Sequence, residues 1–509
     1  MKNLKYSIIA VALSIMSIGC RGDFLETQPT ASTSEKTIFE STANAKMAIN
    51  GIARLMTSQW LSSQGFNGEG TIKMYYGNYP GNDFVVGLSG WVNTISGNYH
   101  EDRSIVYDYY PWQYYYTLIG EANKILVGIE GAEGAQSEKD AITAQALTYR
   151  AYSYFMLSQL YSVRWQDSNN GASDGVVLRL EPTFDDQAIS TLGEVYDQIY
   201  DDLKKAIDLF DASNFERANF YEIDKSVAQA IFARAAITKQ DYETASKYAK
   251  LARQNYPLMS VQEYKSGFKD PNKEWIWGSF DSETETLYFY SFQAYIAYNS
   301  TSSNVRSYPK RISKTLYEKI PATDIRKGMF LDPTGYSINS STGLAGDALD
   351  AHARELYPDL QSNALVYDHM QFKFSANGMP GIGNLNHFRS SEMYLIEAEA
   401  DYFLGKSESS IQGLLEELIT DSGRDPNYSC TATGSNLLTE IKKYRAIELW
   451  GEGFDWFDLK RWKDSIDKKS FSEGGNFLSV IAGKIGPEEK NNWTWKIPLI
   501  EANYNKLVD

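Results

Sequence analysis

Residues 230–257 read AIFARAAITKQDYETASKYAKLARQNYP, and the spacing of their small residues predicts two closely packed helices. Ala233 is followed by Ala245 twelve residues later, by Ala252 seven residues after that, and by Pro257 five further on. Small side chains let two antiparallel helices approach closely, and a proline ends a helix because it has no N–H to donate. The stretch therefore predicts a helical hairpin that stops at Pro257.

The same offsets match the small, small, proline pattern of the tetratricopeptide repeat. One departure is Ala249, which stands where the repeat has a bulky aromatic residue, with Tyr248 one place earlier. Apolar residues at three- and four-residue spacing predict further helices. The predicted helices are 36–59, 111–130, 136–163, 191–211, 224–239, 241–255, 387–404, 407–420 and 436–451. Helix pairs near 112–163, 191–257 and 388–451 would stack into an α-solenoid.

Two stretches without helical period, about 60–110 and 258–386, separate these helical blocks. They are rich in Gly, Ser, Asn and aromatic residues, and Glu274 to Trp277 has the composition of a short strand. Long insertions on a solenoid usually gather on one face, where ligands bind. The predicted fold is mainly α, a tetratricopeptide-like α-solenoid scaffold whose irregular loop and short-strand insertions form a ligand face.

The N-terminus has the pattern of a secretory signal. Lys2 and Lys5 precede an apolar stretch that is too short for a membrane span, and Ser17-Ile-Gly-Cys20 resembles a lipobox, with Ser17 where Leu is usual. We expect residues 1–19 to be a signal peptide, Cys20 to be acylated, and residues 20–509 to form the mature binding domain. An ordinary secreted signal with a coincidental cysteine is the alternative.

The composition narrows the classes of function. A net charge of −16 with no basic stripe argues against a nucleic-acid partner, because such binding rests on neutralising phosphates with Lys and Arg. Aromatic residues reach 14%, led by 36 Tyr and 11 Trp, and they suit surfaces that grip partly polar ligands. A dense core is the alternative use of these rings.

The sequence gives only weak signals for a catalytic or metal-binding site. The four histidines, His100, His352, His369 and His387, are dispersed without metal-ligand spacing, so we expect neither a metal nor a cofactor. The polar run 167–175 lacks the ligand pattern of a calcium loop and reads as a turn. Acidic residues number 65, so a two-carboxylate glycosidase site stays open, although nothing singles out one pair.

Residues 444–462, YRAIELWGEGFDWFDLKRW, combine two aromatic runs with interleaved acids and bases around Gly451 and Gly453. Residues 389–405 read RSSEMYLIEAEADYFLG, and 23–25 read DFL shortly after Cys20. These segments resemble the SusD/RagB family of nutrient-binding outer-membrane lipoproteins of Bacteroidetes. Asp455 departs from the family, which commonly has Arg there. We expect Glu448, Glu452, Asp458 and Arg461 to pack this segment against the body as mutually satisfied charges.

The resemblance implies a function without catalysis. The resemblance implies that this protein binds a glycan or other oligosaccharide and passes it to a SusC-like TonB-dependent transporter. It also implies that a lipid anchor at Cys20 holds the protein on the outer membrane, facing the cell exterior. A surface glycoside hydrolase, or a peptide-binding or adhesive surface lipoprotein, remains the alternative.

Candidate ligand contacts lie among the aromatics of the two insertions, because flat rings stack on sugar faces while nearby polar groups bond the hydroxyls. Trp91 is the first choice, since Gly90 before it and Asn93, Ser96 and Asn98 after it describe an exposed loop. The other predicted contacts are Tyr79, Asn82, Asp83, Trp277, Tyr288, Tyr290 and Tyr298. Core packing is the alternative for each ring.

Overall fold

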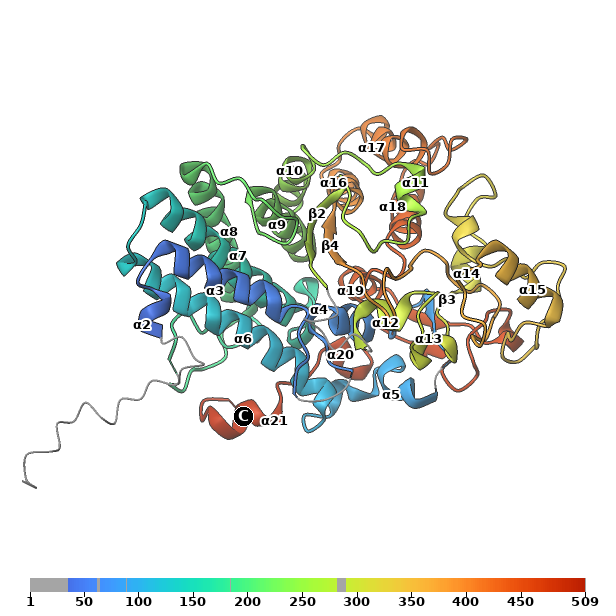
Figure 1. The fold of residues 1–509 in the computed structure, drawn as a ribbon, viewed down its shortest axis with the longest axis horizontal. Helices are drawn as coiled ribbons and strands as arrows, with labels where there is room; N and C mark the ends of the chain where they lie inside the picture. The colour runs from blue at the N-terminus through green and yellow to red at the C-terminus, as the bar shows by residue number, and fades with distance from the viewer. Residues whose placement is uncertain (1–34, 62–64, 88, 184, 282–289, 509) are drawn as a thin grey trace, which may run out of the picture.

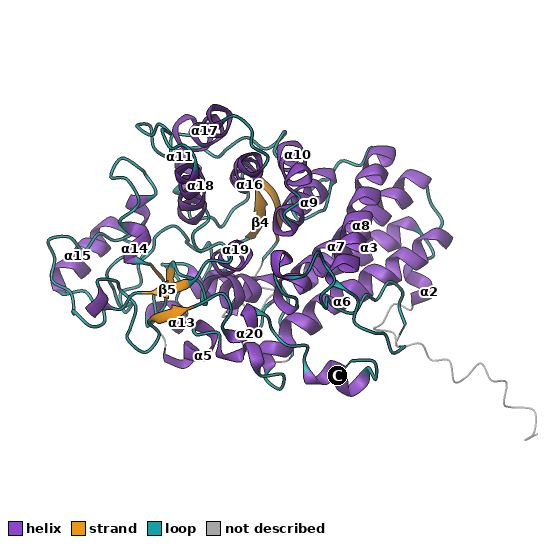
Figure 2. Ribbon diagram, turned by 180° about the vertical axis from the view of Figure 1, so that it is seen from behind, coloured by secondary structure: helices purple, strands orange, loops and turns teal. Residues whose placement is uncertain are grey.

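Helices make up most of the molecule (Figures 1 and 2). The computed structural model describes residues 35–61, 65–87, 89–183, 185–281 and 290–508. The longer helices in this part are α3 (Thr42–Leu55), α6 (Val106–Gly128), α7 (Gln136–Tyr161), α8 (Leu192–Ser213), α9 (Lys225–Lys239), α10 (Tyr242–Ala252), α15 (Asp347–Leu356), α16 (Ser390–Phe403), α17 (Glu408–Glu416), α18 (Ser435–Glu448) and α19 (Asp455–Trp462). No helix in the described ranges is both long enough and apolar enough to cross a bilayer.

The long helices form one continuous array. Helices α6, α7, α8, α9, α10 and α16 pack in succession, α18 packs on α16, and α3 lies against α6 and α7 (Figure 1). This series confirms the predicted tetratricopeptide-like α-solenoid. The helix predicted over 36–59 is instead interrupted at Ser41, whose Oγ accepts the N–H of Asn44 (3.3 Å) and so begins α3 after the short α2 (Glu35–Ile38).

The hairpin of α9 and α10 shows why its sequence specifies two helices. Asp241 follows the left-handed Gln240, and its Oδ1 accepts the N–H of Thr244 (3.2 Å) to cap α10. Ala233, Ala245, Ala249 and Ala252 are fully buried between the helices. The aromatic residue missing at position 249 is supplied one place earlier, because the Tyr248 ring stacks on Phe232 with centroids 4.3 Å apart.

The insertions contain short elements of several kinds. The first holds α4 (Gly68–Thr71), the π-helix η2 (Ile72–Asn78), β1 (Phe84–Val85), η3 (Ser89–Trp91), α5 (Val92–Ile95) and η4 (Asn98–Glu101). The second holds α11 (Val261–Tyr264), β2 (Trp275–Ser279), α12 (Phe292–Ile296), α13 (Ser303–Arg306), β3 (Arg311–Ile312), α14 (Lys314–Tyr317) and η8 (Lys327–Met329) besides α15. Short helices are therefore as much a part of these insertions as loops and strands.

Antiparallel strand pairs join distant parts of the chain. Strand β1 pairs with β3, β5 (Ile466–Lys468) pairs with β6 (Gly483–Ile485), and β2 pairs with β4 (Leu385–Arg389). The strand predicted at Glu274 to Trp277 is thus confirmed as β2. Residues 387–389, predicted as the start of a helix, belong to β4, because their backbone bonds to β2 before α16 begins. The chain ends in α20 (Lys490–Trp493) and α21 (Leu499–Tyr504).

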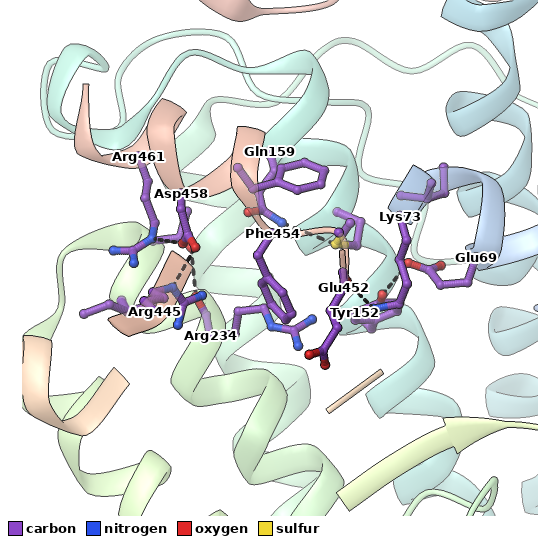
Figure 3. A pocket seen from close by; sticks show the side chains of 16 residues that line it. Glu69, Lys73, Tyr152, Gln159, Arg234, Arg445, Glu452, Phe454, Asp458 and Arg461 are labelled. Carbon is purple, nitrogen blue, oxygen red and sulfur yellow. Dashed lines mark hydrogen bonds and ion pairs between the residues drawn. The ribbon is translucent and has the colours of Figure 1, made fainter. Parts of the chain in front are cut away.

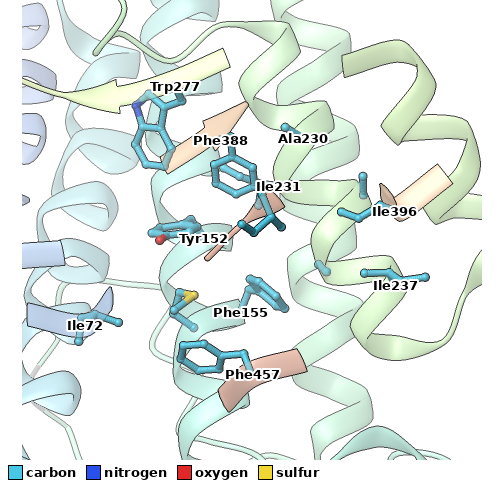
Figure 4. Packing of buried hydrophobic residues seen from close by; sticks show 14 of the residues in the cluster. Ile72, Tyr152, Phe155, Ala230, Ile231, Ile237, Trp277, Phe388, Ile396 and Phe457 are labelled. Carbon is cyan, nitrogen blue, oxygen red and sulfur yellow. The ribbon is translucent and has the colours of Figure 1, made fainter. Parts of the chain in front are cut away.

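A large apolar core runs between the array and the insertions (Figure 4). Trp277 of β2 and Phe388 of β4 lie near Tyr152 of α7, with the Trp277 ring 5.4 Å from that of Tyr152 and 6.1 Å from that of Phe388. A separate small cluster, which includes Leu331, lies under α15. The short strands therefore fasten the insertions to the solenoid through buried rings.

A buried network of charges connects the end of α18 to β2 and β4. Glu448, with no exposed surface, accepts hydrogen bonds from Arg389 (2.6 Å), Arg424 (3.0 Å) and Arg326 (2.8 Å). Arg389 also donates to Glu274 (2.7 Å). We call these five residues the arginine–glutamate network. Charges removed from water must be paired in this way, or burial would be prohibitive.

Glu452, Asp458 and Arg461 of residues 444–462 are also paired with opposite charges, as the sequence predicted. Glu452 accepts from Lys373 (2.7 Å) and Arg389 (2.8 Å). Asp458 accepts from Arg445 (2.7 Å) and Arg461 (2.9 Å). The segment therefore acts as a buried joint between the solenoid and the insertions.

Candidate functional site

Five aromatic rings from four separate stretches of the chain meet beside helix α5. Tyr75 of the π-helix η2 is central, with its ring 4.4 Å from Trp91, 5.6 Å from Tyr79, 6.0 Å from Tyr107 and 5.6 Å from Tyr295. Its hydroxyl donates to Tyr295 Oη at 2.6 Å. We call Tyr75, Tyr79, Trp91, Tyr107 and Tyr295 the aromatic cluster.

The cluster has a buried base and a half-exposed rim. Tyr75, Tyr79 and Tyr295 are 1%, 1% and 5% exposed. Burial raises the pKa of Tyr75 well above its usual value, so its hydroxyl stays neutral. Trp91 and Tyr107 are half-buried and lie further out. The base thus holds the outer rings in place and leaves part of their surface open to a ligand.

Further rings and amides extend this rim. Tyr99 stacks on Tyr107 with centroids 5.0 Å apart and an interplanar angle of 11°. The exposed Asn93 and Asn98 lie next to it, with Asn93 Nδ2 3.4 Å from Tyr99 Oη and Asn98 Nδ2 3.2 Å from Asn93 Oδ1. Half-buried Tyr290 adjoins the cluster through Tyr295, at 6.3 Å between centroids. Rings with amides beside them can stack on a sugar and bond its hydroxyls.

The structure thus brings together three of the predicted aromatic contacts, Trp91, Tyr79 and Tyr290, with Tyr79 in the base rather than at the surface. Tyr288 and Cys20 lie outside the described residues. Tyr107, in the first turn of α6 at the end of the first insertion, is a member of the cluster that was not among the predicted contacts. The repeated tyrosines at 107, 109 and 110 were the available signal.

Two other predicted aromatics lie elsewhere. Trp277 has 0% exposure and packs against Tyr149 and His387 in the main core. Tyr298 packs 5.2 Å from Phe372 in the small core under α15. The burial of Trp277 leaves no ring surface on which a ligand could stack.

Asn82 and Asp83 hold backbone together. Asn82 Oδ1 accepts the N–H of Asp467 (2.6 Å), and its Nδ2 donates to the carbonyl of Ser465 (3.3 Å). Asp83 Oδ1 accepts from Ser313 Oγ (2.9 Å), and its carbonyl accepts from Trp450 Nε1 (2.7 Å). These bonds fix β1 beside α14 and the residues next to β5, so the visible role of both side chains is positioning.

A charged cavity lies behind residues 444–462, between η2, α7 and α19 (Figure 3). Figure 3 shows Asp458 beside Arg445 and Arg461, with Phe454 between this group and Glu69. Burial, opposed in part by nearby carboxylates, lowers the pKa of Lys73 to about 8. The cavity volume of about 30 Å³ admits a water molecule or two, but no sugar ring. It is therefore part of the joint and not a glycan site.

Asp83 and Asp455 form a carboxyl pair that bears on the hydrolase alternative. Asp455 Oδ2 accepts the N–H of Asp83 at 2.7 Å, beside a second cavity of about 30 Å³. Burial, and then the neighbouring Asp83, raise the pKa of Asp455 well above its usual value. A glycosidase needs its two carboxyls on either side of an accessible sugar, and this cavity is too small to hold one.

We expect Asp455→Asn to stabilise the protein at pH 7.5 by about 1 kcal/mol or more, since one unit of pKa shift corresponds to ~1.4 kcal/mol. The folded pKa lies above the unfolded value of about 3.9, so stability is lost as pH rises towards the folded pKa. The gain should therefore shrink from pH 7.5 to pH 5 in urea titrations.

Asp458→Asn, on the same helix, is the matched control. Burial acts to raise the pKa of Asp458, but Arg445 and Arg461 overcome it and hold that pKa below its usual value. Removing this charge should destabilise the fold. If both variants changed stability in the same direction, the assignment of opposite roles to the two carboxyls would be wrong.

Family comparisons cover most of the chain. A SusD-like family model described as "starch-binding associating with outer membrane" matches residues 23–237, and the model of the SusD family matches residues 363–506. SusD-like protein P2 of Formosa agariphila is 25% identical over 487 residues, which cover 90% of this chain and 91% of that protein.

Solved structures share the fold. A SusD-like carbohydrate-binding protein of Bacteroides vulgatus superposes with a TM-score of 0.74 at 22% identity, covering 92% of this chain and 97% of the other. A SusD superfamily protein of Bacteroides thetaiotaomicron gives a TM-score of 0.72 at 22% identity, with 92% and 99% coverage. The helical array and its insertions therefore follow one architecture in all three proteins.

Proposed function

The chain belongs to the SusD/RagB family of carbohydrate-binding proteins, and from this we propose that it captures an oligosaccharide at the cell surface without cleaving it. The observation that carries the proposal is the half-buried ring of Trp91, held by the buried Tyr75, together with the exposed amides of Asn93 and Asn98 beside Tyr99. A preformed aromatic rim binds with little ordering cost, because its side chains are already held in place.

The half-buried rings Trp91, Tyr99, Tyr107 and Tyr290, with the amides beside them, form what we call the aromatic rim. This rim is the proposed binding surface, and Trp91, Tyr99 and Tyr290 are its stacking rings. Tyr79 supports it from below. Each ring has two rotatable side-chain bonds and is braced by neighbours, so stacking on a sugar costs little conformational entropy. Asn93 and Asn98 offer both donors and acceptors to sugar hydroxyls.

Delivery and location form the second part of the proposal. The protein hands its ligand to a SusC-like TonB-dependent transporter and is held at the outer face of the outer membrane by acyl chains on Cys20. Support comes from the family description, which includes association with the outer membrane. Two or three acyl chains give firm anchoring, because each buried methylene contributes about 0.8 kcal/mol.

We expect Trp91→Ala to weaken glycan binding by about 1–3 kcal/mol, on the scale measured for bases stacked on aromatic side chains. The lost ring surface is the physical reason. A glycan array identifies an oligosaccharide that the purified protein retains, and calorimetry with that oligosaccharide then compares the dissociation constants.

Trp165→Ala is the control, because Trp165 is another half-buried tryptophan that packs on Tyr196 in the helical array. It should leave affinity unchanged. Equal affinity of the wild type and Trp91→Ala would remove the rim from the binding site. Release of shortened oligosaccharides by the wild-type protein would favour the hydrolase alternative, and retention of no array glycan would favour the adhesive one.

A further inference from the structure

A long open cleft lies between helix α6, the C-terminal helix α21 and the segment around Arg179, in the helical array. Its volume is about 960 Å³, far larger than the cavities behind residues 444–462. Its lining includes Phe39, Tyr109, Trp112, Val127, Ile500 and Tyr504. Neither the proposed glycan site nor the buried joint uses this surface.

The accessible lining of the cleft is largely apolar and lacks partners in the described part of the chain. Val127 is 60% exposed, Ile500 37% and Tyr504 82%. Trp112, the largest ring, is only 3% exposed, and its Nε1 donates to Glu501 Oε2 at 3.1 Å. Val127 and Ile500 offer no flat face for a sugar, and the exposed ring of Tyr504 can pack on apolar side chains, so this surface suits the apolar side chains of a peptide segment.

The described chain begins at one end of this cleft. Phe39, four residues after the start of α2, lines the cleft and packs so closely on Gly128 that a Cβ there would lie 2.3 Å from Phe39 Cγ. Gly128 ends α6, and Tyr109 lies near the start of that helix. Nineteen residues of helix separate the two, or about 29 Å at ~1.5 Å per residue.

The preceding residues are long enough to span it. Phe24 and Leu25 are apolar, whereas residues 26–34 are mostly polar. The matching family model begins at Asp23, twelve residues before Glu35, so residues 23–34 are counted with the domain. Extended, twelve residues reach about 40 Å at ~3.3 Å each, more than the length of the cleft. Phe24 and Leu25 at the far end of this segment would then meet the end of the cleft formed by Tyr109 and Tyr504.

We propose that residues 23–34 lie extended in this cleft, with Phe24 and Leu25 against Tyr109, Ile500 and Tyr504. Gln113 Oε1 lines the same surface, is buried, and has no hydrogen-bond partner in the described residues. It is suited to accept a backbone N–H from the segment. The docked segment sets the point where Cys20 leaves the body, beside α21. The docking itself does not depend on glycan binding.

Limited proteolysis tests this in the full mature chain carrying Cys20→Ser. Chymotrypsin cleaves after Phe24 and Leu25 when the segment leaves the cleft. Tyr504→Glu places a charge on the apolar surface and should speed this cleavage about tenfold, because cleavage follows the population of the undocked state. Met47→Glu, at a 64% exposed position on α3, is the control and should match the parent.

Equal cleavage rates in the parent, Tyr504→Glu and Met47→Glu would overturn the proposal. A second measurement uses a short bismaleimide cross-linker with Phe24→Cys combined with either Tyr504→Cys or Met47→Cys. Only the first pair should cross-link within the chain, and equal cross-linking of both pairs would contradict docking. If the parent were cleaved rapidly and also bound phospholipid vesicles, residues 23–34 would not be docked in the cleft, and the cleft would instead be a surface that contacts the membrane.

Discussion

Glu448→Gln should lower the free energy of unfolding by about 3–5 kcal/mol, the range found when one partner of a buried ion pair is removed. Glu448 lies between Arg389, Arg424 and Arg326, all with 1% side-chain exposure. The substitution keeps the shape and leaves three guanidinium groups without their shared counter-charge. Equilibrium unfolding in urea measures the loss.

The charged groups around Glu448 give the electrostatic basis of this expectation. Burial acts to raise its pKa, but Arg424, Arg389 and Arg326 outweigh burial and bring the pKa well below its usual value. A depressed folded pKa stabilises the protein above the unfolded pKa, which is about 4.3, and that stability is lost as pH falls towards the folded value. The penalty of Glu448→Gln should therefore be full at pH 7.

Glu318→Gln provides the matched control. Glu318 also pairs with a cation, Lys314 Nζ at 3.8 Å, but the side chains of Lys314 and Glu318 are 39% and 63% exposed. Exposed pairs of this kind contribute about 0–1 kcal/mol. Similar losses in the two variants would show that the arginine–glutamate network is no more important than a surface pair.

Local signals in the sequence explain why the solenoid was predictable. The hairpin of α9 and α10 is specified within its own residues, by Asp241 at the cap and alanines at the interface. Such features depend on neighbours three or four places away, which a sequence displays directly. The strand at Trp275 was predictable for the same reason, from its run of β-forming residues.

The insertions were harder because their partners are distant in the chain. Trp277 and Trp91 both appear as aromatics in irregular stretches, but β2 turns Trp277 into the core while the turn at η3 leaves Trp91 half-buried. Nothing within a few residues of either ring distinguishes the two environments. Strand pairing with β4, more than 100 residues later, decides the burial of Trp277.

Charge pairing gives a second example, because the sequence shows which residues are charged but not which of them form pairs. The sequence predicted that the charges of residues 444–462 satisfy one another, and Asp458 does so locally with Arg445 and Arg461. Glu448, however, finds Arg389 and Arg326, which are 59 and 122 residues away. A single sequence gives the acids and bases, while the fold selects the pairs.

The joint also explains why two glycines, Gly77 and Gly453, lie where the π-helix η2 meets residues 444–462. A Cβ on Gly77 would lie 2.1 Å from the carbonyl oxygen of Gly453. Gly453 itself has φ +91° and lies against the backbone of Lys73. Two backbones can approach this closely only without side chains, and Asn78 then bonds both Gly451 O (2.9 Å) and Gly453 N (2.9 Å).

Gly77→Ala should therefore destabilise the protein by about 3 kcal/mol or more, at the upper end of the cost of overpacking a core, because the methyl group meets backbone that cannot swing aside. Since η2 also carries Tyr75, the strain should reach the aromatic cluster and weaken glycan binding too. Thermal unfolding and calorimetry with the array glycan measure the two effects.

Gly413→Ala is the comparison, because Gly413 of α17 is also helical but has nothing within 4 Å of the position that a Cβ would take. Replacing an unhindered helical glycine by alanine should stabilise the fold by about 0.4–1 kcal/mol. If close backbone contact, and not helix propensity, determines the effect of Gly77→Ala on stability, that variant should be destabilised and the comparison variant stabilised. A stabilising Gly77→Ala would mean that η2 and residues 444–462 can separate freely, and the aromatic cluster would then lack the rigid base on which its binding depends.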